Sequence, residues 1–213
     1  MPKVKICGNT NLADVQKAKA LGADFIGFIF CESKRRITSD QAKEIMQGAG
    51  KFDQFVGVFA NQSKEEVETT LQNLELKWIQ FHGDETSRYC QYFTQRQYQV
   101  IKTFRIKDLM SIKRLDEYDV SAFLFDTFSK TDLGGTGKTF DWNIIAEKPH
   151  VREKLFLSGG LNPQNLGSAI KQVNPFAVDV ASGVEKSPGI KDYALLEQFI
   201  AIAKGKKISG APK

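Results

Sequence analysis

The residues best suited to chemistry in this 213-residue chain are a cysteine and an aspartate, each of which ends a short apolar segment. Cys7 comes just before Gly8, and Asp126 follows Phe123-Leu124-Phe125. A thiol and a carboxyl group can act as base and acid in proton transfer. The two lie on opposite halves of the chain, so they can act together only if the fold brings distant segment ends to one place.

Short apolar runs alternate with polar segments of helical spacing, which predicts eight strand–helix units. The expected strands are Val4–Cys7, Phe25–Phe30, Phe55–Phe59, Trp78–His82, Val100–Phe104, Ala122–Thr127, Leu155–Leu157 and Phe176–Val180. The expected helices are Leu12–Leu21, Ser39–Met46, Ser63–Leu71, Glu85–Gln95, Lys107–Leu115, Trp142–Ala146, Pro163–Lys171 and Tyr193–Ala203.

These units show no composition break, which favours an α/β fold with one compact (β/α)₈ barrel and short loops over an open sheet. We expect the barrel to span residues 1–204 and residues 205–213 to form a flexible tail. The carboxyl ends of the strands meet at one mouth in such a barrel. Cys7 and Asp126 are therefore expected to face one pocket.

Strand parity places polar side chains on the barrel axis, because residues two apart on a strand share a face. On the first, fourth, sixth and eighth strands, alternating apolar residues should face the helices, which leaves inward Lys5, Cys7, Gln80, His82, Asp126 and Asp179. The first and eighth strands become neighbours when the barrel closes. We therefore expect a buried ion pair between Lys5 and Asp179, one layer below Cys7.

Two glycine turns follow the last two expected strands, where barrels of this class hold a phosphate group. One turn contains Gly159 and Gly160, and the other contains Ser182 and Gly183. Glycine lets backbone N–H groups approach an oxyanion closely. The sequence therefore predicts that these residues bind the phosphate of a substrate.

Other features have more than one interpretation. Lys34-Arg35-Arg36 is either a solvated loop or a clamp for a substrate carboxylate. His82 is a general acid, a packing residue or a substrate-positioning residue, and we favour the last two. The segment 134–139 is similar to a nucleotide-binding loop, but Asp132 stands where that pattern needs glycine and no long helix follows. A mobile loop at the active site is the better interpretation.

Composition excludes several classes of function. The net charge of +5 is spread along the chain, so we expect no nucleic-acid partner. The three cysteines form no Cys-x-x-Cys pair and there are two histidines, so neither a disulfide framework nor a metal site is expected. No signal-like or membrane-length apolar stretch is present. We expect a cytoplasmic protein.

Many short fragments, in order along nearly the whole chain, resemble the phosphoribosylanthranilate isomerase family of tryptophan biosynthesis. They are Val4–Gly8, Gly22–Phe28, Ser33–Ile37, Val56–Phe59, Gln80–Gly83, Phe125-Asp126, Gly134–Lys138, Phe140–Trp142, Leu157–Leu161 and Val178–Glu185. The family commonly has two serines before the glycine of the last fragment, where this chain has Ala181-Ser182. That change removes one hydroxyl but leaves the backbone donors.

The resemblance implies a cofactor-free Amadori rearrangement of N-(5-phosphoribosyl)anthranilate to 1-(2-carboxyphenylamino)-1-deoxyribulose 5-phosphate. It implies that Asp126 is the general acid that opens the ribose ring and that Cys7 is the general base at the sugar carbon beside the imine. It further implies that Arg36 holds the anthranilate carboxylate and that the glycine turns hold the phosphate. The expected partner is this small substrate, and the expected assembly is a monomer or a homodimer.

Three alternatives compete with this interpretation. Another phosphosugar isomerase or epimerase could use the same barrel, although the metal-dependent epimerases need histidine ligands that this chain lacks. A catalytically silent phosphate-ligand binder would not need both Cys7 and Asp126. A nucleic-acid module would rest on the basic charge alone.

Overall fold

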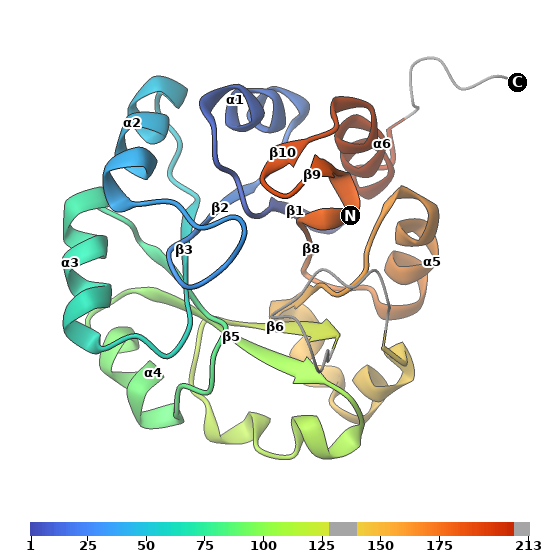
Figure 1. Ribbon diagram of the computed structural model, residues 1–213. Helices are drawn as coiled ribbons and strands as arrows, with labels where there is room; N and C mark the ends of the chain where they lie inside the picture. Colours follow the sequence, from blue (N-terminus) through green and yellow to red (C-terminus); the bar gives the residue numbers. More distant parts are fainter. Residues whose placement is uncertain (128–139, 207–213) are drawn as a thin grey trace, which may run out of the picture.

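Eight parallel strands close into a barrel in the computed structural model, which describes residues 1–127 and 140–206 (Figure 1). Each strand pairs with the next, and β1 pairs with β8 to close the ring. The strands are β1 (Lys3–Ile6), β2 (Phe25–Ile29), β3 (Phe55–Phe59), β4 (Trp78–Phe81), β5 (Gln99–Ile106), β6 (Ala122–Thr127), β7 (Leu155–Leu157) and β8 (Ala177–Val180). The predicted fold class is confirmed.

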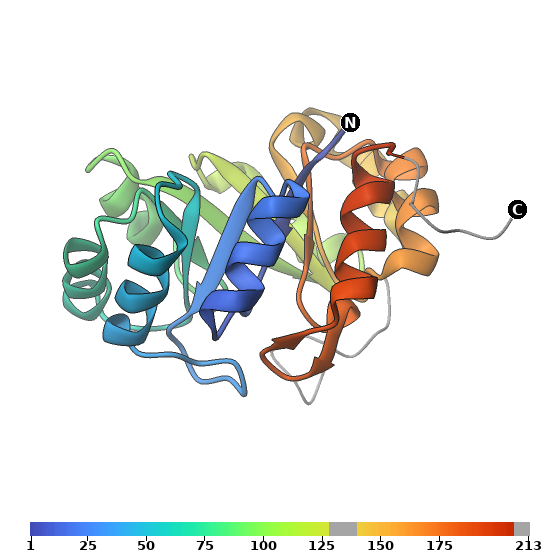
Figure 2. The ribbon, with the colours of Figure 1, turned by 90° about the horizontal axis from the view of Figure 1, so that it is seen from above.

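Helices surround the barrel on its outer side, as Figures 1 and 2 show. The α-helices of the described residues are α1 (Leu12–Leu21), α2 (Ser39–Ala49), α3 (Lys64–Leu74), α4 (Ser87–Thr94), α5 (Pro163–Val173) and α6 (Tyr193–Ala203). Capping boxes begin α2 at Thr38, α3 at Ser63 and α5 at Asn162, where side chains bind the free backbone N–H groups of the first turn.

The expected helices after β5 and β6 are wrong in type. Lys107–Leu115 is replaced by two short 3-10 helices, η1 (Leu109–Ile112) and η2 (Leu115–Glu117), and the chain after β6 forms η3 (Trp142–Glu147) and η4 (Pro149–Lys154). Asp108 caps η1, since its carboxylate accepts the N–H groups of Met110 and Ser111, but the helical turn does not continue beyond Ile112. Pro149 lacks an N–H group, and η3 ends before it.

The chain between β8 and α6 contains an additional structure that the sequence did not predict. η5 (Ser182–Val184) leads into an antiparallel hairpin of β9 (Glu185–Ser187) and β10 (Ile190–Lys191). Figure 2 shows this hairpin at the same end of the barrel as the loop that follows β2. The hairpin is therefore part of the barrel mouth.

Two expectations fall on residues outside the described part of the chain. The segment 134–139, expected to be an active-site loop, lies there entirely. Of the expected flexible tail 205–213, Gly205 and Lys206 are described, and their N–H groups donate to carbonyls at the end of α6. The domain boundary near residue 204 stays a prediction.

Apolar side chains fill the amino-terminal half of the barrel interior. This inner cluster comes from early positions of the strands and consists of Phe25, Val56, Ile101, Ala122, Leu124, Phe156 and Ala177. A larger cluster lies between the strands and the helices. The inner cluster closes the barrel below, so the polar residues that follow it on the same strands face the mouth.

Candidate active site

A pocket of about 790 Å³ opens at the carboxyl ends of the strands, within the size range of small-ligand sites. Cys7 and Asp126 both line it, although they lie 119 positions apart in the sequence (126 minus 7). Other lining residues from the strands and the turns are Gln80, His82, Ser158, Gly159, Gly160, Asp179, Ser182 and Gly183. The structure therefore brings the thiol and the carboxyl group to one cavity, as strand parity predicted.

Cys7 lies directly after β1 and is almost fully buried, with 6% of its surface exposed. Its backbone N–H donates to Val180 O of β8 at 2.8 Å. Below it, Lys5 Nζ lies 2.7 Å from Asp179 Oδ1, which confirms the expected ion pair. Ser158 Oγ donates to the other oxygen of Asp179 at 3.0 Å. The floor beneath the thiol is thus a fixed polar network.

The charges around Cys7 act on its proton in opposite directions. Burial raises the pKa of the Cys7 thiol above its ordinary value, and the charge and hydrogen bond of Lys5 partly offset this rise. Burial alone would lower the pKa of Lys5, but Asp179 and Cys7 outweigh it and raise that pKa. Lys5 therefore stays cationic beside a thiol that is protonated at rest.

Asp126 is held in a fixed orientation at the end of β6. Its Oδ1 accepts the N–H of Thr127 at 2.8 Å, and its Oδ2 lies 3.3 Å from His82 Nε2, at an angle that makes no hydrogen bond. Gln80 Nε2 lies 3.0 Å from His82 Nδ1 and also donates to Thr103. With the amide as donor, Nδ1 accepts and the ring proton sits on Nε2, facing Asp126.

The two glycine turns are packed against the acid and against each other. A Cβ atom on Gly159, whose φ is +87°, would lie 2.3 Å from Thr127 Oγ1 and 3.0 Å from Asp126 Oδ1. A Cβ atom on Gly183 would lie 1.9 Å from Leu161 O. Among the described residues, the N–H groups of Gly159 and Gly160 donate to no partner. The turn of Gly159 and Gly160 therefore presents two backbone donors at the pocket edge that no described residue engages.

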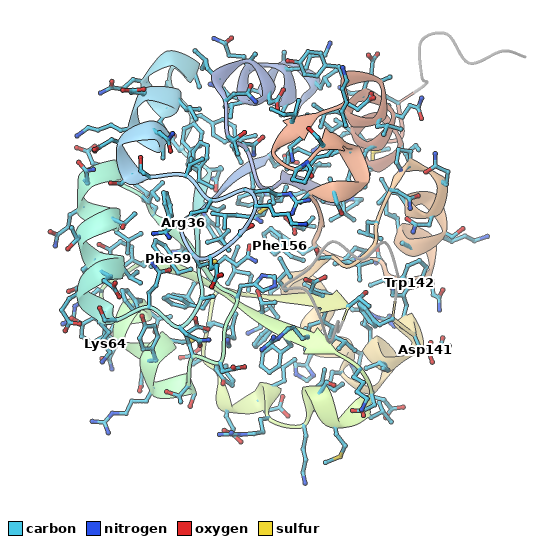
Figure 3. The ribbon with its side chains drawn as sticks, viewed as in Figure 1. Arg36, Phe59, Lys64, Asp141, Trp142 and Phe156 are labelled. Atoms are coloured by element: carbon cyan, nitrogen blue, oxygen red, sulfur yellow. The ribbon has the colours of Figure 1, made fainter. Side chains whose placement is uncertain are left out.

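The two arginines after β2 have different surroundings. Arg35 lines the pocket, and its guanidinium donates three hydrogen bonds to Glu185. Arg36 is exposed and is not among the lining residues. Figure 3 shows it on the loop that follows β2, and its guanidinium has no ion-pair partner within residues 1–127 and 140–206. The role expected for Arg36 stays a prediction.

Sequence reasoning missed Gly27 of β2 as a site residue. A Cβ atom there would lie 2.7 Å from Cys7 Sγ and 3.3 Å from Lys5 Nζ. The pairing of Lys5 with Phe25 and of Ile6 with Ile26 brings Gly27 beside Cys7. Phe25, Gly27 and Ile29 share the inward face, so a glycine on that face next to the first strand was the available signal.

The described residues contain neither a metal-binding cluster nor a membrane-spanning helix. No group of three or more His, Cys, Asp or Glu side chains gathers in a way that could hold a metal ion. No helix in this part of the chain is long and apolar enough to cross a membrane. Cys7, Cys31 and Cys90 are all free thiols.

A sequence model of the N-(5'phosphoribosyl)anthranilate (PRA) isomerase family matches residues 4–202. The chain belongs to the PRA isomerase family. The N-(5'-phosphoribosyl)anthranilate isomerase of Caldanaerobacter subterraneus subsp. tengcongensis is 45% identical over 206 residues, which cover 96% of this chain and 99% of that protein. The isomerase of Geobacter sulfurreducens is 44% identical over 206 residues, with coverage of 96% and 100%.

Solved PRA isomerase structures have the same barrel. The phosphoribosyl anthranilate isomerase of Thermotoga maritima superposes with a TM-score of 0.88 at 41% identity, covering 96% of this chain and 100% of that one. A phosphoribosyl anthranilate isomerase in complex with reduced 1-(o-carboxyphenylamino)-1-deoxyribulose 5-phosphate superposes at 0.84 and 39% identity, with the same coverage. The chain is thus an isomerase that interconverts an aldose and a ketose.

Proposed function

We propose that this chain catalyses the cofactor-free Amadori rearrangement of N-(5-phosphoribosyl)anthranilate to 1-(2-carboxyphenylamino)-1-deoxyribulose 5-phosphate in tryptophan biosynthesis. The observation that carries the proposal is the single pocket shared by Cys7 and Asp126 in a chain of the PRA isomerase family. The reaction needs one proton delivered and one removed on the same sugar. A pocket with a carboxyl group and a thiol provides both groups.

Asp126 is the proposed general acid. It delivers a proton to the ring oxygen of the ribose while the anilino nitrogen donates its lone pair to C1, so the C1–O bond breaks and a protonated Schiff base forms. The hydrogen bond from the Thr127 N–H fixes the direction of the Asp126 carboxyl group, and His82 Nε2 lies 3.3 Å from its other oxygen. His82 is the proposed positioning residue, since its ring proton faces the carboxylate that remains after transfer.

Cys7 is the proposed general base. Its thiolate removes the proton from C2 of the sugar, and the C2–H electrons form the C1=C2 bond while the iminium nitrogen regains its lone pair. The resulting enol becomes the ketose when C1 gains a proton and the hydroxyl group on C2 loses one. Burial favours the protonated thiol of Cys7. The positive charge of Lys5 offsets part of this effect and so favours formation of the thiolate. The nitrogen is the electron sink, so the step uses no cofactor.

The two ends of the substrate carry negative charges that the pocket edge can hold. We assign the phosphate to the turns of Gly159, Gly160, Ser182 and Gly183, since the first two offer free N–H groups. We assign the anthranilate carboxylate to Arg36. Arg35 is already neutralised by Glu185, whereas the guanidinium of Arg36 has no carboxylate partner in the described residues.

We further propose that the protein is cytoplasmic and acts as a monomer or a homodimer. A solved structure that aligns with a TM-score of 0.86 and 39% identity contains monomers generated from the dimeric enzyme of T. maritima. The three free thiols agree with a reducing compartment.

The test follows the fluorescence of the anthranilate ring while enzymatically prepared substrate is mixed with catalytic amounts of protein. Catalysis predicts a signal that falls until the substrate is consumed, and a silent binder predicts a change that stops at one equivalent. Asp126→Asn and Cys7→Ser should each abolish most of the turnover. Cys90→Ser is the matched control, because this free thiol is buried in the core between strands and helices and does not line the pocket. Equal activity in all three variants would contradict the proposal.

A further inference from the structure

Three charged side chains form a connected cluster at the mouth, which we call the clasp: Arg35, Glu185 and Lys191. Lys191 of β10 is 1% exposed. Its Nζ donates to the backbone carbonyl of Cys7 at 2.6 Å and to Glu185 Oε1 at 2.9 Å. An ammonium group therefore binds the peptide unit of the proposed base, 184 residues away in sequence.

Arg35 completes the clasp from the loop after β2. Its Nε and Nη2 donate to the Glu185 carboxylate at 2.7–3.0 Å. Its stem also lies over Gly8, where a Cβ atom would be 2.5 Å from Arg35 Cδ, and φ at Gly8 is +69°. Lys191 and Arg35 thus hold the Cys7-Gly8 turn, and Glu185 ties the two cations together.

The hairpin that carries Lys191 is itself fixed to the chain that follows Cys7. The Lys191 N–H donates to Asp14 Oδ2 at 2.9 Å, and Thr10 Oγ1 donates to Gly189 O at 2.6 Å. Figure 2 shows the hairpin projecting from the mouth beside the loop after β2. Lys191 is therefore locked in place before any substrate binds, as preorganised catalysis requires.

The clasp contains two basic side chains and one carboxylate. Burial lowers the pKa of Lys191, and the charge and hydrogen bond of Glu185 partly offset this effect. The charged and titratable groups facing Cys7 are Lys5 and Asp179 from inside the barrel, and Lys191, Arg35 and Cys31 at the mouth. Lys5 is paired with Asp179, but its charge still lowers the pKa of the Cys7 thiol. Lys191, held on the Cys7 carbonyl, adds to Lys5 a second basic group whose charge favours the thiolate over the thiol.

We propose that Lys191 is a positioning residue for the proposed base: it fixes the Cys7 backbone and supplies charge that favours the thiolate. Arg35 and Glu185 keep Lys191 and the Cys7-Gly8 turn in fixed positions relative to each other. This inference rests on the proposed role of Cys7. A purely structural salt bridge would affect folding stability alone, whereas a positioning role also shifts the pH dependence of catalysis.

The test compares Lys191→Met and Lys191→Gln with Lys191→Arg by steady-state kinetics across pH. The two neutral variants should lose about tenfold or more in kcat with KM within about twofold. Their rise of kcat/KM with pH should move to higher pH. Lys191→Arg keeps the charge and should restore both. Lys186→Met removes an exposed cation of the same hairpin and should leave rate and profile unchanged.

Each outcome decides the matter. The inference is overturned if Lys191→Met and Lys191→Gln fold and keep the wild-type pH profile. It is also overturned if neither variant folds, since the clasp would then act on stability only. Cys7→Ser, measured alongside, distinguishes failure of the positioning role of Lys191 from failure of the proposed role of Cys7. If Cys7→Ser is inactive and the profile of Lys191→Met is unshifted, the positioning role fails alone. If Cys7→Ser is fully active, the proposed mechanism fails first.

Discussion

Gly27→Ala should damage catalysis more than any other single methyl group added to the barrel interior. The new Cβ would lie 2.7 Å from Cys7 Sγ, whereas van der Waals contact requires about 3.5–4.0 Å. The Cys7 Cα, at 3.3 Å, and Lys5 Nζ, at 3.3 Å, leave little room on the other sides. The sulfur must therefore move by about 1 Å, a displacement that can cost about 100-fold in rate.

Stopped-flow fluorescence should therefore show kcat reduced by about 100-fold in Gly27→Ala, with KM changed by less than about threefold. Gly57→Ala is the matched control in the next strand. Its Cβ would lie 2.8 Å from a ring carbon of Phe59, on the outer side of the barrel. Both variants should lose about 1–3 kcal/mol of stability through overpacking. Wild-type kcat in a folded Gly27→Ala would refute the reasoning.

Three further substitutions separate binding, charge and stability. Arg36→Met should raise KM by about tenfold, because a charge-assisted hydrogen bond to the substrate is lost. The free energy of unfolding should change by less than about 0.5 kcal/mol. An unchanged KM in steady-state kinetics would argue against the assignment of Arg36. Lys5→Met should lower the free energy of unfolding in urea by about 3–5 kcal/mol, because it leaves Asp179 buried without its cation; a loss below about 1 kcal/mol would contradict this. Burial opposes ionisation of Glu185, but Arg35 and Lys191 outweigh it and lower the pKa of that carboxyl. Its stabilisation is therefore present above the ordinary pKa of 4.5 and lost as pH falls through the lowered value, so acid unfolding curves should show that Glu185→Gln lacks this pH-dependent part.

Strand parity allowed much of the site to be predicted. Side chains alternate between the two faces of each strand, and the barrel closes by pairing its first strand with its last. The Lys5–Asp179 pair follows from parity and from the neighbouring of β1 and β8. The common pocket of Cys7 and Asp126 follows from the same rule. These features depend on strands, whose order in a barrel follows the order in sequence.

Features set by loops could not be predicted in the same way. The contact of Lys191 with Cys7 depends on the β9–β10 hairpin after β8. The sequence of this hairpin lacks the alternation of apolar and polar residues that predicts strands. The difference between Arg35 and Arg36 depends on where Glu185 lies. After β6, Pro149 lacks the N–H group that would continue η3, and after β5 the residue spacing does not distinguish short 3-10 helices from an α-helix. Local patterns carry no information on these tertiary contacts.

The most direct test of the central claim is the turnover number of Cys7→Ser at saturating substrate, with binding of the reduced product analogue measured on the same sample. A serine hydroxyl has nearly the shape of the thiol but is a far weaker acid, so it supplies almost no anion near neutral pH. The account predicts unchanged affinity for the analogue and a kcat reduced by about 100-fold or more. Near wild-type turnover would show that the sulfur does not remove the proton.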